Sequence, residues 1–340
     1  MLIRISLTKL MPLTNSNFVV SIGHVPLLDS APLLVAQQEN LFEKYGAEVK
    51  IEDQVGWATV RDKLIHGELD MASTLIGLPY AMHHGVGCFE TNTKIPLILS
   101  MNGNSITLTS DISPEDLNNQ EAIAEALEKR TADKDRKWTF ATVNPYSSHL
   151  ILLSKWLNTY LSSHISEIEI VFIPPQLLPD LLEQGMIDGY CAGEPWGSLA
   201  TKNGVGHIVS NSLELSPDHP EKILAVPQRT IETKEEGVIA VGKALLEACQ
   251  LCQSEDYTDK LVSILSNYDA LELKETDTLN LLKNKSSNNE RQHKFYGDQS
   301  NIPTPEREQW VIKGLKEAGL FRKKVISTGQ IMTPELLFKE

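Results

Sequence analysis

Cysteine and histidine are the residues with the most obvious chemistry in this chain of 340 residues. Cys249 and Cys252 form a CxxC motif inside KALLEACQLC, a stretch typical of a helix, where two such cysteines more often pack in a core than bind metal or undergo redox chemistry. His83 and His84 are adjacent, so their side chains diverge on a helix, and no carboxylate lies at a useful spacing. No second CxxC or HxxxH motif, P-loop, GxGxxG or GxSxG motif is present. The sequence therefore predicts no metal site, no cofactor and no catalytic residue.

Composition excludes some partners. A hydrophobic content of 41% in 340 residues is enough for two ordinary domains with their own cores. The formal net charge of −14 argues against direct binding to nucleic acid or to anionic membranes. The net charge does not exclude a small anionic ligand, because one buried cation can dominate the electrostatic potential inside a closed site.

The first twenty residues, MLIRISLTKLMPLTNSNFVV, carry Arg4 and Lys9 between short apolar runs. They contain no apolar segment of the length of a signal peptide, no small-residue cleavage site and no lipobox cysteine. Nowhere does the chain have about 18 uninterrupted apolar residues, the minimum for a membrane span. We therefore expect a cytoplasmic protein, or a periplasmic one if a signal peptide lies upstream.

Strand and helix patterns alternate along the chain. Asp29 or Ser30 is expected to cap a helix that stops at Gly46, and Ser113 to start another helix. We predict strands at 18–22, 49–51, 138–143 and 168–173, helices at 57–67 and 149–161, loops at 131–137 and 283–301, and mostly helices after about 230. This alternation indicates an α/β protein with largely parallel sheets.

A short pattern occurs twice, in LIHGELDMA (64–72) and LLEQGMIDGYC (181–191). Each reads as a helix end, then Gly-x-x-Asp, then a short apolar strand, and the two lie about 115 residues apart, a typical domain spacing. Two unrelated αβ turns are the alternative. The repeat predicts two lobes of similar build, with a ligand cleft between them at the carboxyl ends of strands. We place lobe 1 at 1–108, lobe 2 at 109–212, and the return to lobe 1, with C-terminal helices, at 213–340.

Five stretches resemble one family: 23–46, 55–70, 190–207, 218–226 and 293–303. The most specific are Gly-Glu-Pro-Trp at 193–196 and Asp-His-Pro-Glu-Lys at 218–222. Together they resemble the nitrate- and bicarbonate-binding proteins of ABC transporters, which have the type II periplasmic-binding-protein fold. The resemblance extends over roughly residues 18–325 and implies a two-lobed α/β fold with a ligand cleft between the lobes.

The resemblance also implies a set of anion ligands. In the family an anion sits on a Trp, an amide or carboxylate side chain, a His, a Gly backbone and a Lys, and the matching positions here are Trp57, Asn104, His149, Gly193 and Lys222. These types suit a planar monoanion, which needs donors on its rim and a counter-charge. Taken alone, each position has a plainer interpretation: a structural His, a surface Lys, a packed Trp and a turn Gly.

Asn104 departs from the family pattern, in which nitrate binders generally have Gln and bicarbonate binders an acidic residue. Nitrate and nitrite only accept hydrogen bonds, whereas bicarbonate also donates one, and an Asn side chain offers both an acceptor and donors. Considered by itself, Asn104 favours nitrate or nitrite without excluding bicarbonate.

The expected role follows from the lack of a signal-peptide pattern in the first twenty residues. The family includes a cytoplasmic nitrate/nitrite sensor that releases an RNA-binding antiterminator when the anion binds, and we predict this role, by a shift between open and closed lobes. The first alternative is the solute receptor of a nitrate or bicarbonate ABC transporter, with a permease as partner. A thiamin-pyrimidine-synthase-like enzyme is less favoured, because the chain lacks the Cys-rich motif of those enzymes.

Overall fold

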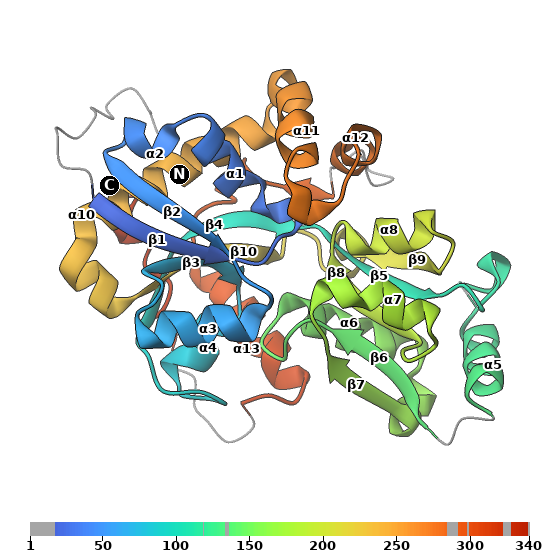
Figure 1. Cartoon of the computed structure of the whole chain (residues 1–340). Coiled ribbons are helices and arrows are strands. Elements are labelled where there is room, and N and C mark those ends of the chain that lie inside the picture. The colour runs from blue at the N-terminus through green and yellow to red at the C-terminus, as the bar shows by residue number, and fades with distance from the viewer. Residues whose placement is uncertain are drawn as a thin grey trace.

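The structure, a computed structural model, describes residues 18–117, 119–132, 136–283, 292–297, 299–321 and 328–338. Two lobes lie side by side, each built on its own β-sheet with helices on both faces (Figure 1). We call the part around the six-stranded sheet lobe 1 and the part around the five-stranded sheet lobe 2. The predicted two-lobed α/β architecture is confirmed.

The sheet of lobe 1 has the strand order β11-β4-β10-β3-β1-β2. Its strands are β1 (Phe18–His24), β2 (Ala47–Asp53), β3 (Met71–Leu75), β4 (Thr93–Asn102), β10 (Pro220–Pro227) and β11 (His293–Lys294). One face packs against α1 (Ala31–Gln38), α2 (Leu41–Lys44), α10 (Gln228–Gln253) and α11 (Thr258–Ser266), and α11 contacts α12 (Glu275–Lys283). The other face packs against α3 (Trp57–His66), α4 (Leu78–His83) and α13 (Pro305–Glu317).

The sheet of lobe 2 has the order β7-β6-β8-β5-β9. Its strands are β5 (Asn104–Thr109), β6 (Trp138–Thr142), β7 (Ile168–Phe172), β8 (Gly189–Gly193) and β9 (Gly206–Asn211). Helices α5 (Gln120–Thr131) and α6 (Ser148–Tyr160) cover one face, α7 (Leu178–Glu183) and α8 (Trp196–Lys202) the other, and α9 (Ser212–Leu215) follows β9. Short 3-10 segments lie at Leu28–Ser30, Pro114–Asp116, Ser162–Glu167, Pro175–Leu177, Glu255–Tyr257, Asp269–Leu271 and Pro334–Leu336.

Both sheets are mixed. Three neighbouring strands are parallel in each, β2-β1-β3 in lobe 1 and β7-β6-β8 in lobe 2. The other strands pair antiparallel, so the prediction of largely parallel sheets is wrong. The reason is that the chain crosses between lobes, from β4 through Gly103 into β5, and from β9 through α9 back to β10. The parallel strands of each lobe have their carboxyl ends toward the other lobe. Strands β5 and β10 are the first strands after a crossing, so they start at that edge and run in the opposite direction.

The repeated Gly-x-x-Asp pattern has the same structure in both lobes. Gly67 and Gly185 follow α3 and α7 with left-handed φ angles of 78° and 68°. The carboxylate of Asp70 accepts the Ser21 N–H of β1 at 2.9 Å, and that of Asp188 accepts the Thr139 N–H of β6 at 2.7 Å. Each aspartate thus ties the strand that follows it to the central strand of the parallel set. The two turns are equivalent parts of two similar lobes.

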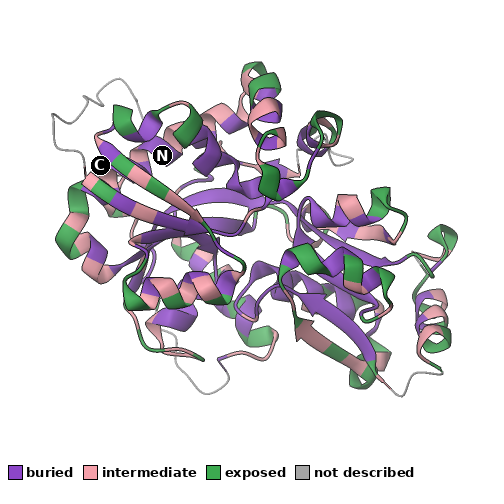
Figure 2. Cartoon of the chain, viewed as in Figure 1, coloured by how far each residue is buried: buried purple, intermediate pink, exposed green. Residues whose placement is uncertain are grey.

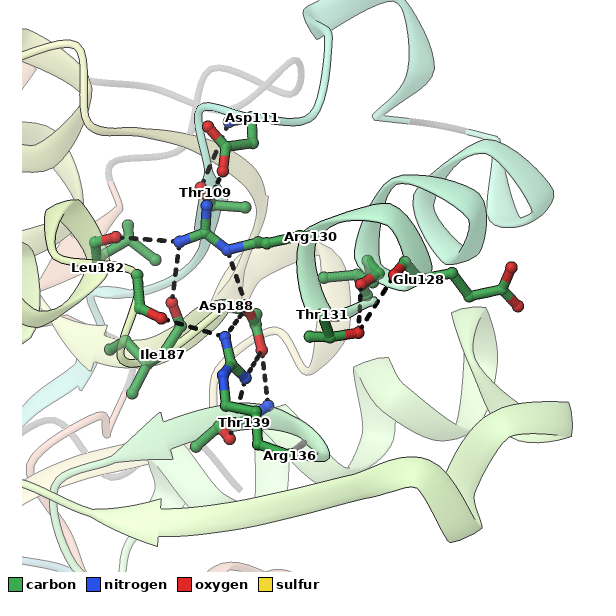
Figure 3. A network of polar contacts seen from close by, with 12 residues as sticks. Thr109, Asp111, Glu128, Arg130, Thr131, Arg136, Thr139, Leu182, Ile187 and Asp188 are labelled. Atoms are coloured by element: carbon green, nitrogen blue, oxygen red, sulfur yellow. Dashed lines mark hydrogen bonds and ion pairs between the residues drawn. The ribbon is translucent and has the colours of Figure 1, made fainter. Parts of the chain in front are cut away.

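The surroundings of these two aspartates differ. Figure 3 shows Arg130 of α5 and Arg136 both directed at Asp188, at 2.9 Å and 2.6 Å from its carboxylate oxygens. Asp188 is fully buried. In lobe 1 only Lys234 of α10 pairs with Asp70 among the described residues, at 2.8 Å, and the Asp70 side chain is 22% exposed.

Burial follows the sheet order. The inner strands β3 and β10 of lobe 1 and β5, β6 and β8 of lobe 2 are buried, whereas the inner strand β1 and the outer strands β2 and β7 also carry intermediate and exposed residues (Figure 2). Cys249 and Cys252 are buried in the α10 side of the lobe 1 core as free thiols, which confirms the packed pair. Within the described ranges, no helix is long and apolar enough to span a membrane.

Several local predictions need correction. The helix expected at Ser113 begins only at Gln120, where the Asn119 side chain accepts two backbone N–H groups. Neither Asp29 nor Ser30 caps α1 with its side chain. The expected loop at 283–301 includes the short strand β11, while 284–291 and 298 lie outside the described residues. Residues 1–17, and 133–135 of the loop at 131–137, also lie outside them.

The change of sheet along the chain is well defined. The first sheet gives way to the second at Gly103, and the chain returns to the first sheet between β9 and β10. The division into domains at 108/109 and 212/213 stays a prediction.

Candidate functional site

The centre of the site is β10, the strand with which the chain returns to lobe 1. Adjacent residues of a regular strand point to opposite faces of the sheet, yet Glu221 and Lys222 meet there at 2.8 Å. The pairing of β10 with β4 shifts register on both sides of Lys222. Such an irregularity turns side chains away from strict alternation, and here it lets both charged groups reach one place.

Lys222 is fully buried and has two acidic neighbours. Its Nζ lies 2.8 Å from Asp29 Oδ2 and 2.8 Å from Glu221 Oε1. It also stands 5.2 Å from the ring centroid of Trp57, a cation–π distance. Burial alone would lower the pKa of Lys222, but the two carboxylates raise the pKa above its ordinary value, so the ammonium stays charged.

Glu221 connects lobe 1 to lobe 2. Its Oε2 accepts hydrogen bonds from Asn104 Nδ2 at 2.6 Å and from the hydroxyl of Ser148. His149 Nε2 lies 3.1 Å from its other oxygen. Burial opposes ionisation, but Lys222 and His149 hold the pKa of Glu221 well below its ordinary value. A buried carboxylate of one lobe therefore accepts donors from the other.

The lobe 2 residues come from three element ends: the beginning of α6, the beginning of β5 and the end of β8. Ser148 and His149 begin α6, where the Ser147 hydroxyl caps the helix by accepting the Leu150 N–H at 3.1 Å. Free N–H groups and the helix dipole make such an end favourable for an anion. Asn104 and Gly193 pair across β5 and β8, and a Cβ at Gly193 would stand 3.4 Å from Asn104 Oδ1.

Trp57 approaches the same place from lobe 1. It is the first residue of α3, after Gly56 in extended conformation, and it is 2% exposed. Its Nε1 has no hydrogen-bond partner among the described residues. The indole therefore supplies an apolar wall beside Lys222 together with one uncommitted donor.

Two buried histidines flank the crossings between lobes. The ring of His293 packs on Gly103, where a Cβ would come within 2.3 Å of its Nε2, and the His219 carbonyl accepts the Asn102 N–H. Burial lowers the pKa of both, that of His293 to about 4, so both are neutral at pH 7.

The structure brings together all five residues predicted as ligands: Trp57, Asn104, His149, Gly193 and Lys222. Their role as ligands stays a prediction. The sequence does not single out Asp29 and Glu221, because Asp29 has the pattern of a helix cap and Glu221 lies in the charged run Asp-His-Pro-Glu-Lys at 218–222. The apolar ILAV after Lys222 was the one available signal that this run enters a buried strand. Across the described residues, no group of three or more His, Cys, Asp or Glu could hold a metal ion.

Two lobes on mixed sheets, with charged and polar groups from both meeting between them, define the periplasmic-binding-protein class of fold. Residues 16–266 match the model of the NMT1-like family, and the chain belongs to that family. Among solved structures, the periplasmic nitrate-binding protein NrtA from Synechocystis PCC 6803 has the same fold, with a TM-score of 0.81, 22% identity, and 95% of this chain and 88% of that chain covered.

Curated relatives point to nitrate and bicarbonate transport systems. The chain is 29% identical to the nitrate import ATP-binding protein NrtC of Synechocystis, covering 88% of this chain and 46% of NrtC. It is 34% identical to the bicarbonate transport ATP-binding protein CmpC of Synechococcus elongatus, covering 73% of this chain and 37% of CmpC. It therefore spans less than half the length of these two relatives. It is 26% identical to the nitrate/nitrite binding protein NrtA of Nostoc, covering 86% of this chain and 68% of NrtA.

The predicted resemblance to nitrate- and bicarbonate-binding proteins is thus confirmed. These relatives are named as transport and binding proteins, which favours the transporter alternative over the sensor. The antiterminator partner and the cytoplasmic location stay predictions.

Proposed function

We propose that this chain is the anion-binding module of an ABC transport system for nitrate, nitrite or bicarbonate. It holds one small planar oxyanion between its lobes and performs no chemistry on it. The observation that carries the proposal is the convergence, in one buried site, of Lys222 and Trp57 from lobe 1 with Asn104, His149 and Gly193 from lobe 2.

The chemistry of these groups supports an oxyanion. Lys222 is a buried cation, and the beginning of α6 adds the positive end of a helix dipole. The indole N–H of Trp57 and the backbone of Gly193 can contact a flat anion without a long side chain in the way. Because the site draws on both lobes, a bound anion would favour the closed arrangement of the lobes. The names of the relatives agree with this ligand class.

Calorimetric titration of the chain with nitrate, nitrite, bicarbonate and sulfate tests the proposal. We expect heat of binding from at least one of the first three anions and none from sulfate, which is tetrahedral and doubly charged. No binding by any of the planar anions would refute the function.

Lys222→Ala tests the location of the site. Removal of the buried counter-charge should weaken anion binding by about 3–5 kcal/mol. The control is Lys129→Ala, because Lys129 pairs with Glu125 within the exposed face of α5 in lobe 2, and its loss should leave affinity nearly unchanged.

Lys222→Ala also leaves two buried carboxylates without their partner, so its folded fraction must be measured by thermal unfolding. Trp57→Phe keeps the ring and removes only the N–H, and it should weaken binding by about fivefold without unfolding the chain. Unchanged affinity in both variants would show that the anion binds elsewhere.

A further inference from the structure

Helix α13 of lobe 1 packs against α6 of lobe 2, at the boundary of the two lobes (Figure 1). Each helix is held by its own lobe. Glu308 of α13 accepts a hydrogen bond from the Tyr80 hydroxyl of α4 at 3.4 Å, whereas Trp156 of α6 is buried in the lobe 2 core. The spacing between α13 and α6 therefore sets the spacing between the lobes at this point, because packed cores deform little.

Gly314 of α13 permits the close approach of these helices. A Cβ at this position would stand 2.7 Å from Cγ2 and 2.8 Å from Cδ1 of Ile151 in α6. Glycine is less favourable than alanine inside a helix, so α13 by itself gives no reason for glycine here. The reason is the neighbour: Ile151 is buried and β-branched, so its side chain has little freedom to turn away from an added methyl group.

A second close contact lies beside the first. Gly77 lies just before α4 of lobe 1, and a Cβ there would stand 2.6 Å from the backbone oxygen of Tyr146 in lobe 2. The same Cβ would stand 3.0 Å from Cδ1 of Leu315 in α13. Tyr146 immediately precedes Ser147, the cap of α6. Glycines from two elements of lobe 1 thus meet lobe 2 close to the beginning of α6.

The contact lies beside the lobe 2 half of the candidate site. Ile151 follows Ser148 and His149 in α6 by three and two residues. The Ser148 hydroxyl donates to Glu221, and His149 Nε2 lies 3.1 Å from the same carboxylate. These contacts join the lobes directly, so a wider gap between α13 and α6 would lengthen them.

The same face of α13 also contacts the segment that leads to Glu221. Trp310 lies four residues before Gly314 and therefore on the same side of the helix. Its Nε1 donates to the Ser216 hydroxyl at 2.9 Å, and its ring stacks on His219 with the ring centroids 5.1 Å apart. One helix face thus supports both chain segments that meet at Glu221.

We propose that Gly314 is a positioning residue for the anion site. Its lack of a side chain sets the spacing of α13 and α6, and through that spacing it sets the fit of the lobe 2 residues on Glu221. The inference rests on the proposed function, and it assigns part of the anion affinity to a contact between the lobes that does not touch the ligand. One added methyl group at this position would be felt at the site, because close-packed helices transmit strain.

The test is calorimetric titration of Gly314→Ala with nitrate and with bicarbonate. We expect the affinity for whichever anion binds the unaltered chain to fall by about tenfold. Ile151→Ala removes the side-chain atoms that the new methyl group would meet, so the double variant should recover most of the lost affinity. Ile151→Ala alone completes the double-mutant cycle.

Gly242→Ala is the matched control. Gly242 lies in α10, which packs on the other face of the lobe 1 sheet, and a Cβ there would stand 2.5 Å from Cδ2 of Leu337. Its substitution crowds a helix to the same degree without touching α6. It should lower the thermal stability and leave the anion affinity of the folded chain unchanged. Thermal unfolding of every variant gives the folded fraction to which each affinity refers.

The outcomes separate the inference from the function on which it rests. If the unaltered chain binds none of the planar anions, the proposed function fails, and the inference fails with it. If the unaltered chain binds and folded Gly314→Ala keeps its affinity, the function stands and the role of Gly314 is refuted. An equal loss in Gly242→Ala, or no recovery in the double variant, would also overturn it. If Gly314→Ala does not fold, the double variant decides: full affinity supports the inference and weak binding refutes it.

Discussion

The two lobes share a scaffold and differ in where they bury charge. Both contain a central strand between two parallel neighbours and a Gly-x-x-Asp turn that ties two of them together. Lobe 1 leaves its scaffold aspartate partly exposed and buries its charges at the site. Lobe 2 buries an aspartate and two arginine contacts inside its scaffold and presents Asn104, Ser148 and His149 to the site. Asp70 and Asp188 therefore occupy equivalent turns in two similar lobes, but their ion pairs differ in burial and number.

The largest expected effect is that of Asp188→Ala in lobe 2. The change leaves the partly buried guanidinium of Arg136 without its carboxylate, leaves Arg130 with Asp111 as its acidic partner, and removes the acceptor of the Thr139 N–H. We expect the free energy of unfolding to fall by about 3–5 kcal/mol. Urea unfolding followed by circular dichroism measures it, and a loss below about 1 kcal/mol, typical of a surface ion pair, would contradict the distinction between the lobes.

The next effect concerns pH and His293 of lobe 1. Burial lowers the pKa of this residue from 6.5 to about 4. The unfolded chain therefore binds a proton at higher pH than the folded chain, so stability is lost as pH falls from 6.5 toward 4, by about 3 kcal/mol in full. Urea unfolding at several pH values should show this slope, and His293→Gln should flatten it. An equally steep slope in the variant would assign the acid sensitivity to other groups.

The smallest effect is that of Asp70→Ala, the lobe 1 counterpart of Asp188→Ala. The Lys234 side chain is 36% exposed and that of Asp70 22% exposed, so water compensates for much of the lost pairing. The backbone N–H of Ser21 loses its side-chain acceptor as well. We expect a loss of about 1 kcal/mol by the same unfolding measurement. If this variant loses as much stability as Asp188→Ala, burial does not explain the difference between the lobes.

Much of the scaffold is predictable because its signals are local. Helix α3 begins at Trp57, as predicted. It ends before Gly67 because this glycine adopts a left-handed conformation that stops the helix. Helix α6, predicted at 149–161, begins at Ser148 because the Ser147 side chain caps its first turn. The repeat was visible because a turn of this type needs Gly and Asp at set positions.

The antiparallel strands and the acidic half of the site were not predictable in this way. Strands β4, β5 and β10 are defined by partners in distant segments, and a register shift in β10 leaves no local mark. Glu221 is buried against Asn104 and Ser148, which donate to its carboxylate and lie 117 and 73 residues away in the sequence.

The place of β10 in the sheet has a consequence for synthesis of the chain. Lobe 2 is built from one continuous segment, β5 to β9, so its sheet can form as soon as that segment leaves the ribosome. Strand β10 lies between β3 and β4, which precede lobe 2 in the chain, and only its arrival completes the middle of the lobe 1 sheet. The inserted lobe can thus fold first, and the strand that brings Lys222 and Glu221 joins β3 to β4 and completes the candidate site in the same step.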